Sequence, residues 1–178
     1  MRLHFKNARL IDPETGTDTL GDLFVVDGLI SDEVDVDEVI ECRGKCLAPG
    51  IVDIGVKVSE PGERHKESFA SAGRAAVAGG ITTIVTRPDT DPAIDTPETL
   101  EFVERRASID AAVNVLPMAA LTKGRAGREM TEIGFLLDAG AVAFTDCDRV
   151  VTNTKIFSRV LTYAHSLGTL VIGHVQEP

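Results

Sequence analysis

The fold is decided by one stretch, which reads Leu47-Ala48-Pro49-Gly50-Ile51-Val52-Asp53-Ile54-Gly55-Val56-Lys57-Val58-Ser59-Glu60-Pro61-Gly62. Its centre is an apolar run of strand length, opened by Pro-Gly and closed by Glu-Pro-Gly, and both flanks are turn signals. Alternate residues of a strand point to the same side. We therefore expect a buried strand that presents Gly55, Lys57 and Ser59 on one face.

Beyond residue 47 the chain alternates strand-length apolar runs with helical stretches. Glycines that suit helix C-caps precede the second, fourth and fifth strands. The predicted strands are 51–58, 81–86, 111–117, 141–145 and 170–174, and the predicted helices lie near 66–79, 97–107, 127–139 and 153–167. Repeated strand–helix units predict parallel strands with right-handed crossovers, in an α/β fold.

The length of the chain bears on which parallel fold this is. Five parallel strands form either an open doubly wound sheet or the first part of an eight-stranded barrel, and a complete barrel needs about 250 residues. With 178 residues, we expect the sequence to be a fragment or a piece that needs another. Residues 1–48 contain short strands and turns, including the hairpin signal Asp27-Gly28, and predict a separate β-subdomain before a barrel part at 49–178.

The composition excludes several classes of partner. The net charge is −10 with no basic stripe, which argues against binding to nucleic acid or to anionic membranes. No signal-peptide pattern and no apolar run long enough for a bilayer is present, so we expect a cytoplasmic protein. Cys42, Cys46 and Cys147 are expected to be reduced core or loop residues.

Residues 47–62 resemble the start of the cyclic amidohydrolases, and dihydroorotase most closely, where the pattern is L-x-P-G-x-[VI]-D-x-H-x-H-x-R-E-P-G. The flanks match, but Gly55 and Lys57 stand at the two His positions and Ser59 stands at the Arg position. The resemblance implies about strands 1–5 of a (β/α)8 TIM-type amidohydrolase barrel, preceded by a small segment of a composite β-sandwich.

Two further stretches carry the same resemblance. Residues 82–92 are similar to G-x-T-T-x-x-x-M-P-N-T-x-P, with Arg87 at the Met position and Asp89 at the position of a substrate-binding Asn. Residues 121–132 are similar to I-T-x-G-x-x-G-x-x-L-x-E, which supports the topology and adds no catalytic group.

Two positions keep the family's metal ligands. Residues 140–148 are similar to G-A-V-A-F-[ST]-D-D-G, whose first Asp is a metal ligand in the bacterial dihydroorotases of this type, so the resemblance gives that role to Asp146. The neighbouring position has become Cys147. Residues 171–177 are similar to V-x-x-H-x-E-D, whose His binds metal, and His174 is retained there.

The substitutions predict that the family's zinc chemistry is lost. Gly55 offers no ligand atom, and the Lys57 ammonium repels a cation. Ser59 cannot form the planar fork by which an Arg holds a carboxylate, and Asp89 would repel a carboxylate substrate. We assign no catalytic residue and expect zinc to bind weakly or not at all. Because a buried carboxylate needs a counter-charge, we also expect Lys57 to pair with Asp146.

Three functions remain open on the sequence. The first is an inactive dihydroorotase-like protein of pyrimidine biosynthesis that acts as a scaffold or partner of aspartate carbamoyltransferase, as the resemblance implies. The second is an active metal-dependent cyclic amide hydrolase with an altered site, and the third is a small-molecule binding module. A homo-oligomer or hetero-oligomer is expected, but no residue specifies the interface.

Overall fold

The structure is a computed structural model that describes residues 1–32 and 35–176. It divides into two compact units, Met1–Gly50 and Ile51–Pro178, which we describe separately. The sequence analysis places the division between residues 48 and 49. Among the described residues, no helix is both long enough and apolar enough to cross a membrane.

The first unit is a single β-sheet. Its strands are β1 (Arg2–Asp12), β2 (Thr17–Val26), β3 (Leu29–Ser31), β4 (Glu38–Glu41) and β5 (Cys46–Leu47). The order is β3-β2-β1-β4, with β5 also paired to β1. Asp27 and Gly28 both have positive φ and make the tight β2–β3 turn that the sequence predicts. The described residues of this unit form this one sheet, and the composite sandwich stays a prediction.

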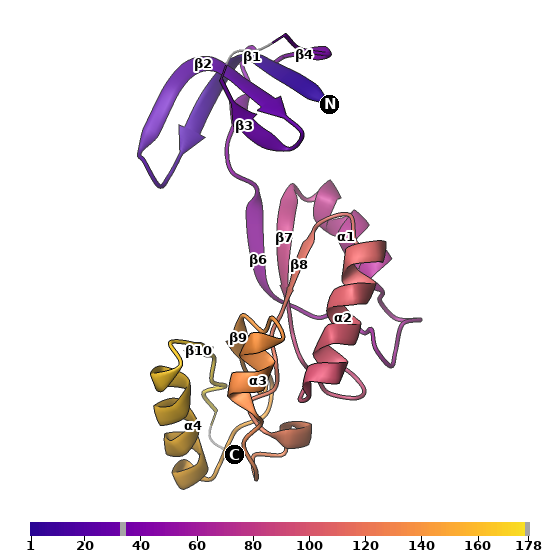
Figure 1. Cartoon of the computed structure of the whole chain (residues 1–178), viewed down its shortest axis with the longest axis vertical. Coiled ribbons are helices and arrows are strands. Elements are labelled where there is room, and N and C mark those ends of the chain that lie inside the picture. Colours follow the sequence, from indigo (N-terminus) through magenta and orange to yellow (C-terminus); the bar gives the residue numbers. More distant parts are fainter. Residues whose placement is uncertain (33–34, 177–178) are drawn as a thin grey trace. The chain divides into compact units, whose positions relative to one another are not determined.

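The second unit is built on parallel strands (Figure 1). The strands are β6 (Ile51–Val56), β7 (Ile81–Thr86), β8 (Asn114–Pro117), β9 (Ala143–Phe144) and β10 (Leu170–Val171). β6, β7 and β8 pair directly, and β9 pairs with β10. Main-chain bonds from Ala119 N to Ala143 O and from Val142 N to Pro117 O join the two groups. All five carboxyl ends therefore lie along one edge.

Helices connect these strands, and three of them begin at side-chain N-caps. They are α1 (Phe69–Ala78), α2 (Pro97–Asp110), α3 (Ile133–Asp138) and α4 (Thr154–Ser166). Ser68 and Thr96 accept backbone N–H bonds at the starts of α1 and α2. Figure 1 shows α1 and α2 beside β7 and β8, which they contact.

The prediction of a helix over 127–139 is wrong in its first half, because α3 begins only at Ile133. The preceding residues form a loop with a short 3-10 turn at Lys123–Arg125. Gly127 N donates to Thr122 Oγ1, and the Thr131 hydroxyl donates to Ala120 O (2.8 Å each). These side-chain bonds hold the chain in a loop where local propensity favours a helix.

The parallel sheet separates two apolar clusters. The larger cluster lies on the helix side and includes Ile84 and Phe144. The smaller one contains Val85, Met118 and Ala143, with Ile172 packed against it. Because these residues come from neighbouring strands and alternate with those of the larger cluster, they mark the opposite, inner side of the sheet.

Candidate functional site at the carboxyl ends of the strands

A cavity of about 350 Å³ lies at the carboxyl ends of the parallel strands. It is lined by residues at the ends of several strands or just after them, including Ile54, Gly55, Arg87, Met118, Cys147 and His174. Ligands of parallel α/β folds bind at this edge, because the loops that follow the strands converge there. The cavity is therefore the candidate functional site.

The first strand contributes Ile54 and the backbone of Gly55 to this cavity. β6 shifts register against β7 between Ile54 and Val56, and Gly55 at this irregularity has φ +93°. A residue with a side chain is strained at such an angle. Gly55 therefore supplies no ligand atom, and a His at this position would require the strand to change its path.

Two cations meet one buried carboxylate beside the cavity. Lys57 Nζ lies 3.0 Å from Asp89 Oδ2. Arg87 binds the same group with a planar fork, from Nε to Oδ1 (3.1 Å) and from Nη2 to Oδ2 (2.8 Å). The Asp89 side chain is 4% exposed, that of Arg87 is 30% exposed and that of Lys57 is 53% exposed. The charge of the buried carboxylate is thus balanced by protein cations.

The predicted pair between Lys57 and Asp146 is wrong. Asp146 is buried, and its Oδ1 accepts from the backbone N–H groups of Leu121 and Thr122 (3.0 Å each). Its Oδ2 accepts from the Thr122 hydroxyl (2.5 Å). Neutral donors of the loop after β8 thus satisfy this carboxylate, while Lys57 is held by the nearer Asp89.

Asp146 also organises the loop through its own backbone. The buried Arg125 guanidinium donates to the Asp146 carbonyl oxygen (3.1 Å from Nη2) and pairs with the Asp148 carboxylate. Arg149 Nη1 donates to the carbonyls of Gly124 and Arg125 (3.2 Å each). These contacts join the loop that follows β8 to the loop that follows β9.

The surroundings of the retained His174 and of the altered position Ser59 differ. His174 is exposed, its Nε2 lies 2.8 Å from Gln176 Oε1, and it shares a small cavity of about 110 Å³ with Asp146. Ser59, at the family's Arg position, is buried, and its carbonyl oxygen accepts from Glu63 N (2.8 Å). Of the positions predicted from the sequence, Gly55 and His174 line the cavity of about 350 Å³.

Cys147 also lines the cavity, whereas the sequence predicts only a reduced core or loop residue at this position. It lines the cavity together with Thr145, and both share the side of Ala143, which belongs to the inner cluster. Burial raises the pKa of the Cys147 thiol, and the Asp89 carboxylate raises it further, while Arg87 opposes this. Strand alternation could not have identified this residue, because β9 ends at Phe144, Cys147 has φ +57°, and Asp148 lines the same cavity.

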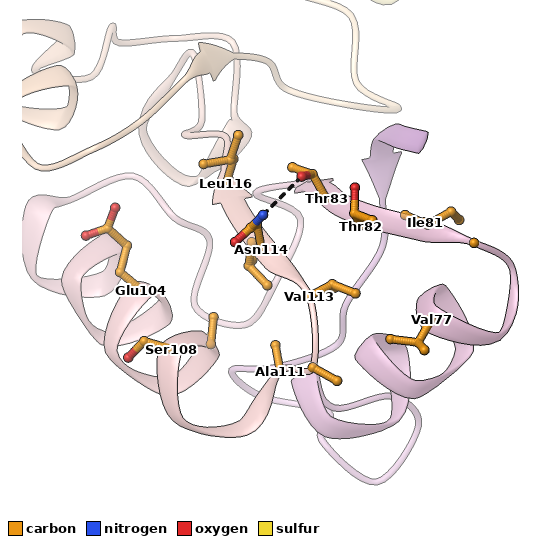
Figure 2. A pocket seen from close by; sticks show the side chains of 14 residues that line it. Val77, Ile81, Thr82, Thr83, Glu104, Ser108, Ala111, Val113, Asn114 and Leu116 are labelled. Carbon is orange, nitrogen blue, oxygen red and sulfur yellow. Dashed lines mark hydrogen bonds between the residues drawn. The ribbon is translucent and has the colours of Figure 1, made fainter. Parts of the chain in front are cut away.

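A larger cavity, of about 830 Å³, lies at the opposite end of the strands (Figure 2). It is lined by the first residues of β7 and β8 and by α2. Its only ionisable lining group is Glu104, whose pKa is raised by burial and by the nearby Glu101. Asn114 Nδ2 donates to Thr83 Oγ1 at 3.4 Å within this wall. A single carboxylate gives this cavity little chemistry.

The chain is similar to known proteins over most of its length. A family model described as dihydro-orotase-like matches residues 44–177, which is most of the chain.

The chain belongs to the dihydroorotase-like family.

A relative within this family is the dihydroorotase of Endomicrobium trichonymphae, which is 41% identical over 99% of this chain. The match spans 42% of that relative's length.

Solved structures show the fold. An L-hydantoinase (dihydropyrimidinase) from Arthrobacter aurescens superposes with a TM-score of 0.83 at 22% identity, over 98% of this chain and 41% of that one. A crystal structure of a dihydroorotase superposes with a TM-score of 0.63 at 14% identity, over 99% of this chain and 52% of that one. The chain thus has the mixed α/β fold of the N-terminal part of these proteins.

The donor set of this dihydroorotase-like chain does not fit the zinc site that the family implies. A zinc site needs at least three protein ligands with free lone pairs. Gly55 has none, Lys57 is held in an ion pair, and both oxygens of Asp146 accept hydrogen bonds from the loop. Within residues 1–32 and 35–176, no three His, Cys, Asp or Glu side chains are grouped to hold a metal ion.

Proposed function

We propose that this chain is a catalytically inactive dihydroorotase-like protein of pyrimidine biosynthesis, located in the cytoplasm, which acts as a scaffold or partner of aspartate carbamoyltransferase. Its five parallel strands would be the first strands of a (β/α)8 barrel. Its N-terminal sheet would form one layer of a composite β-sandwich.

The observation that carries the proposal is the ion-pair cluster of Lys57, Arg87 and Asp89. In the family's motifs these positions belong to a metal-binding His, a Met and a substrate-binding Asn. Here they bind one another, with Lys57 Nζ 3.0 Å and Arg87 Nη2 2.8 Å from the same carboxylate oxygen. Because side chains supply the positive charge at these strand ends, a divalent cation is not needed there. Without such a cation there is no open coordination site at which water could be activated.

The exposed side chains of β6 support an assembly. This strand forms the edge of its sheet, and Val52 and Ile54 are 54% and 67% exposed. Apolar strand edges of this kind are normally covered by further strands or by another chain. Such a cover would come from a homo-oligomer, from a hetero-oligomer, or from the part of the family's length that this sequence does not span.

A second function, an active cyclic amide hydrolase with an altered site, is favoured by one observation. Asp146 and His174, the two retained ligand positions, line the same small cavity of about 110 Å³. Against it, the Asp146 oxygens are already engaged by three donors, two backbone N–H groups and one hydroxyl.

Turnover separates these two functions. The intact protein is assayed in both directions, for ring opening of dihydroorotate and ring closure of carbamoyl aspartate, with zinc added. The dihydroorotase of Endomicrobium trichonymphae, assayed in parallel, is the active control. We expect no turnover above the uncatalysed rate, and a rate within a hundredfold of the control would contradict inactivity.

Partnership is tested separately. Purified aspartate carbamoyltransferase from the same source is mixed with the protein and analysed by size-exclusion chromatography with light scattering. We expect a complex of defined stoichiometry. Separate elution of both proteins at micromolar concentrations would contradict the scaffold role and leave inactivity standing.

A further inference from the structure

We propose that the cavity at the amino ends of β7 and β8 binds an organic ammonium ion, with its charged group on the carboxylate of Glu104 and its hydrocarbon body along the apolar wall (Figure 2). The cavity has a volume of about 830 Å³, which lies within the range of about 300–1,000 Å³ that is usual for small-molecule sites. It is at the opposite end of the strands from the candidate site described above. The proposal therefore goes beyond the scaffold role and does not depend on it.

Glu104 carries a charge that no cation among the described residues balances. It is half-buried on α2 and is the one ionisable residue of the cavity lining. Burial raises the pKa of its carboxyl, the charge of Glu101 raises it further, and no basic group of the described chain opposes this. A lone carboxylate has no partner for acid–base catalysis, but it is sufficient to bind a cation. Such a cation would stabilise the ionised form that burial disfavours.

The Glu104 carboxylate is held against the backbone between α3 and β9. Its Oε1 lies so close to Gly140 that a side chain at that position would collide with it. Gly140 has φ +107°, a conformation that glycine adopts readily and other residues rarely adopt. The Gly140 N–H donates to Leu137 O (2.9 Å) and not to Glu104. This backbone thus fixes the place of the carboxylate and leaves its acceptor capacity to a ligand.

Two neutral polar residues of the lining have already used a donor inside the protein. Ser108 follows Glu104 by one turn on the same face of α2, and its hydroxyl donates to Arg105 O (2.9 Å). On β8, Asn114 Nδ2 donates to Thr83 Oγ1 (3.4 Å), and the side-chain carbonyl oxygen of Asn114 remains as an acceptor. An ammonium group has three donors and no acceptor. It therefore complements this lining, whereas a carboxylate or a phosphate does not.

The remainder of the wall is apolar. Ile81, Val113 and Val115 line the cavity and pack against the larger apolar cluster. A hydrated metal ion gains nothing from such a wall, and one carboxylate falls short of the several oxygen ligands that Ca²⁺ or Mg²⁺ takes. The lining thus favours an ammonium group attached to an aliphatic or aromatic body.

Titration of the intact protein with 2-phenylethylammonium, followed by two-dimensional NMR of the backbone amides, tests the proposal. 2-Phenylethanol has the same shape without the charge, and methylammonium has the charge without the hydrocarbon body. We expect 2-phenylethylammonium to bind at least about tenfold more tightly than either, because a hydrogen bond to a charged group contributes about that factor or more. The amides of Thr82 and Ala112, which line the cavity, should shift. Equal affinity for either control compound, or shifts confined to other parts of the chain, would overturn the proposal.

A matched pair of variants assigns the binding to Glu104. Glu104→Gln should weaken binding of 2-phenylethylammonium about tenfold or more and leave that of 2-phenylethanol unchanged. Glu98→Gln makes the same substitution at an exposed residue of the same helix that does not line the cavity, and it should bind like the parent. Equal affinity in the two variants would show that the general negative charge of the chain attracts the ligand, and would contradict the assignment.

Heat denaturation gives a second readout of the same pair. A ligand that binds only the folded state raises the melting temperature. Saturating 2-phenylethylammonium should therefore raise the melting temperature of the parent and of Glu98→Gln, and should raise that of Glu104→Gln much less. An equal rise in all three proteins would overturn the proposal.

Discussion

Asp89 and Asp146 are both buried carboxylates near the carboxyl ends of the strands, yet they are stabilised in different ways. Asp89 is held by two side-chain cations, and Asp146 by two backbone N–H groups and one hydroxyl. In the first arrangement two cations face one carboxylate, and in the second the carboxylate keeps its negative charge among neutral donors. The comparison shows that Asp89 is held by side chains that reach solvent, while Asp146 belongs to the framework that shapes the loops.

The largest effect should come from removing the framework carboxylate. Asp146→Ala leaves the N–H groups of Leu121 and Thr122 without their acceptor in a buried place. We expect a loss of about 3 kcal/mol in the free energy of unfolding, because each unsatisfied buried donor costs about 1–3 kcal/mol. Urea unfolding measures it, with Asp138→Asn at the exposed end of α3 as the control. A loss no larger than that of the control would mean that the loop does not depend on Asp146.

Removing the charge of Asp89 should cost less. Asp89→Asn keeps the shape and part of the hydrogen bonding, and both cations it releases can reach solvent. We expect a loss of about 1–2 kcal/mol in the free energy of unfolding.

Lys57→Met sharpens the same comparison. The Lys57 side chain is more than half exposed, so its ion pair should contribute less than about 1 kcal/mol. If Lys57→Met proved as damaging as Asp146→Ala in urea unfolding, the cluster would have to be reclassified as part of the framework.

The smallest effect should come from Glu104, a carboxylate that is held, among the described residues, neither by side-chain cations nor by backbone N–H groups. Burial and the charge of Glu101 raise the pKa of Glu104 above its ordinary value of 4.5. A raised pKa means that the folded state binds the proton more tightly, so ionised Glu104 lowers stability at neutral pH. We expect Glu104→Gln to raise the melting temperature slightly at pH 7.

The pH dependence of that variant checks the sign. The advantage of Glu104→Gln should be present above the raised pKa and should disappear as the pH falls below about 4.5, where Glu104 is protonated in both states. Melting curves from pH 4 to pH 8 measure it. An advantage that grew on acidification would contradict the direction of the shift.

Much of the second unit could be predicted from sequence because its signals are local. Glycines and caps gave the positions of β7, α2 and α4 within a few residues. The helix predicted at 127–139 failed in its first half because the Thr122 side chain, which Asp146 fixes, binds the start of that segment. Local patterns contain no information about such contacts.

The candidate site was predictable in its residues and less so in its pairings. The motifs singled out Lys57, Asp89 and Asp146, but the partner of Lys57 depends on how neighbouring strands are staggered. That stagger is set by the irregularity at Gly55 and by packing. As a result Lys57 lies nearer to Asp89 than to Asp146 and forms its ion pair with Asp89. The roles of Arg87 and Cys147 emerge only when the strand ends are brought together.

The central claim is that side-chain cations at this mouth replace a divalent metal. The direct test is to incubate the protein, stripped with a chelator, with zinc at a few equivalents, remove free metal by gel filtration, and measure bound zinc by mass spectrometry. We predict well below one zinc per chain, with the same residual amount in His174→Ala. One or more tightly held zinc ions per chain, lost in His174→Ala, would contradict the account.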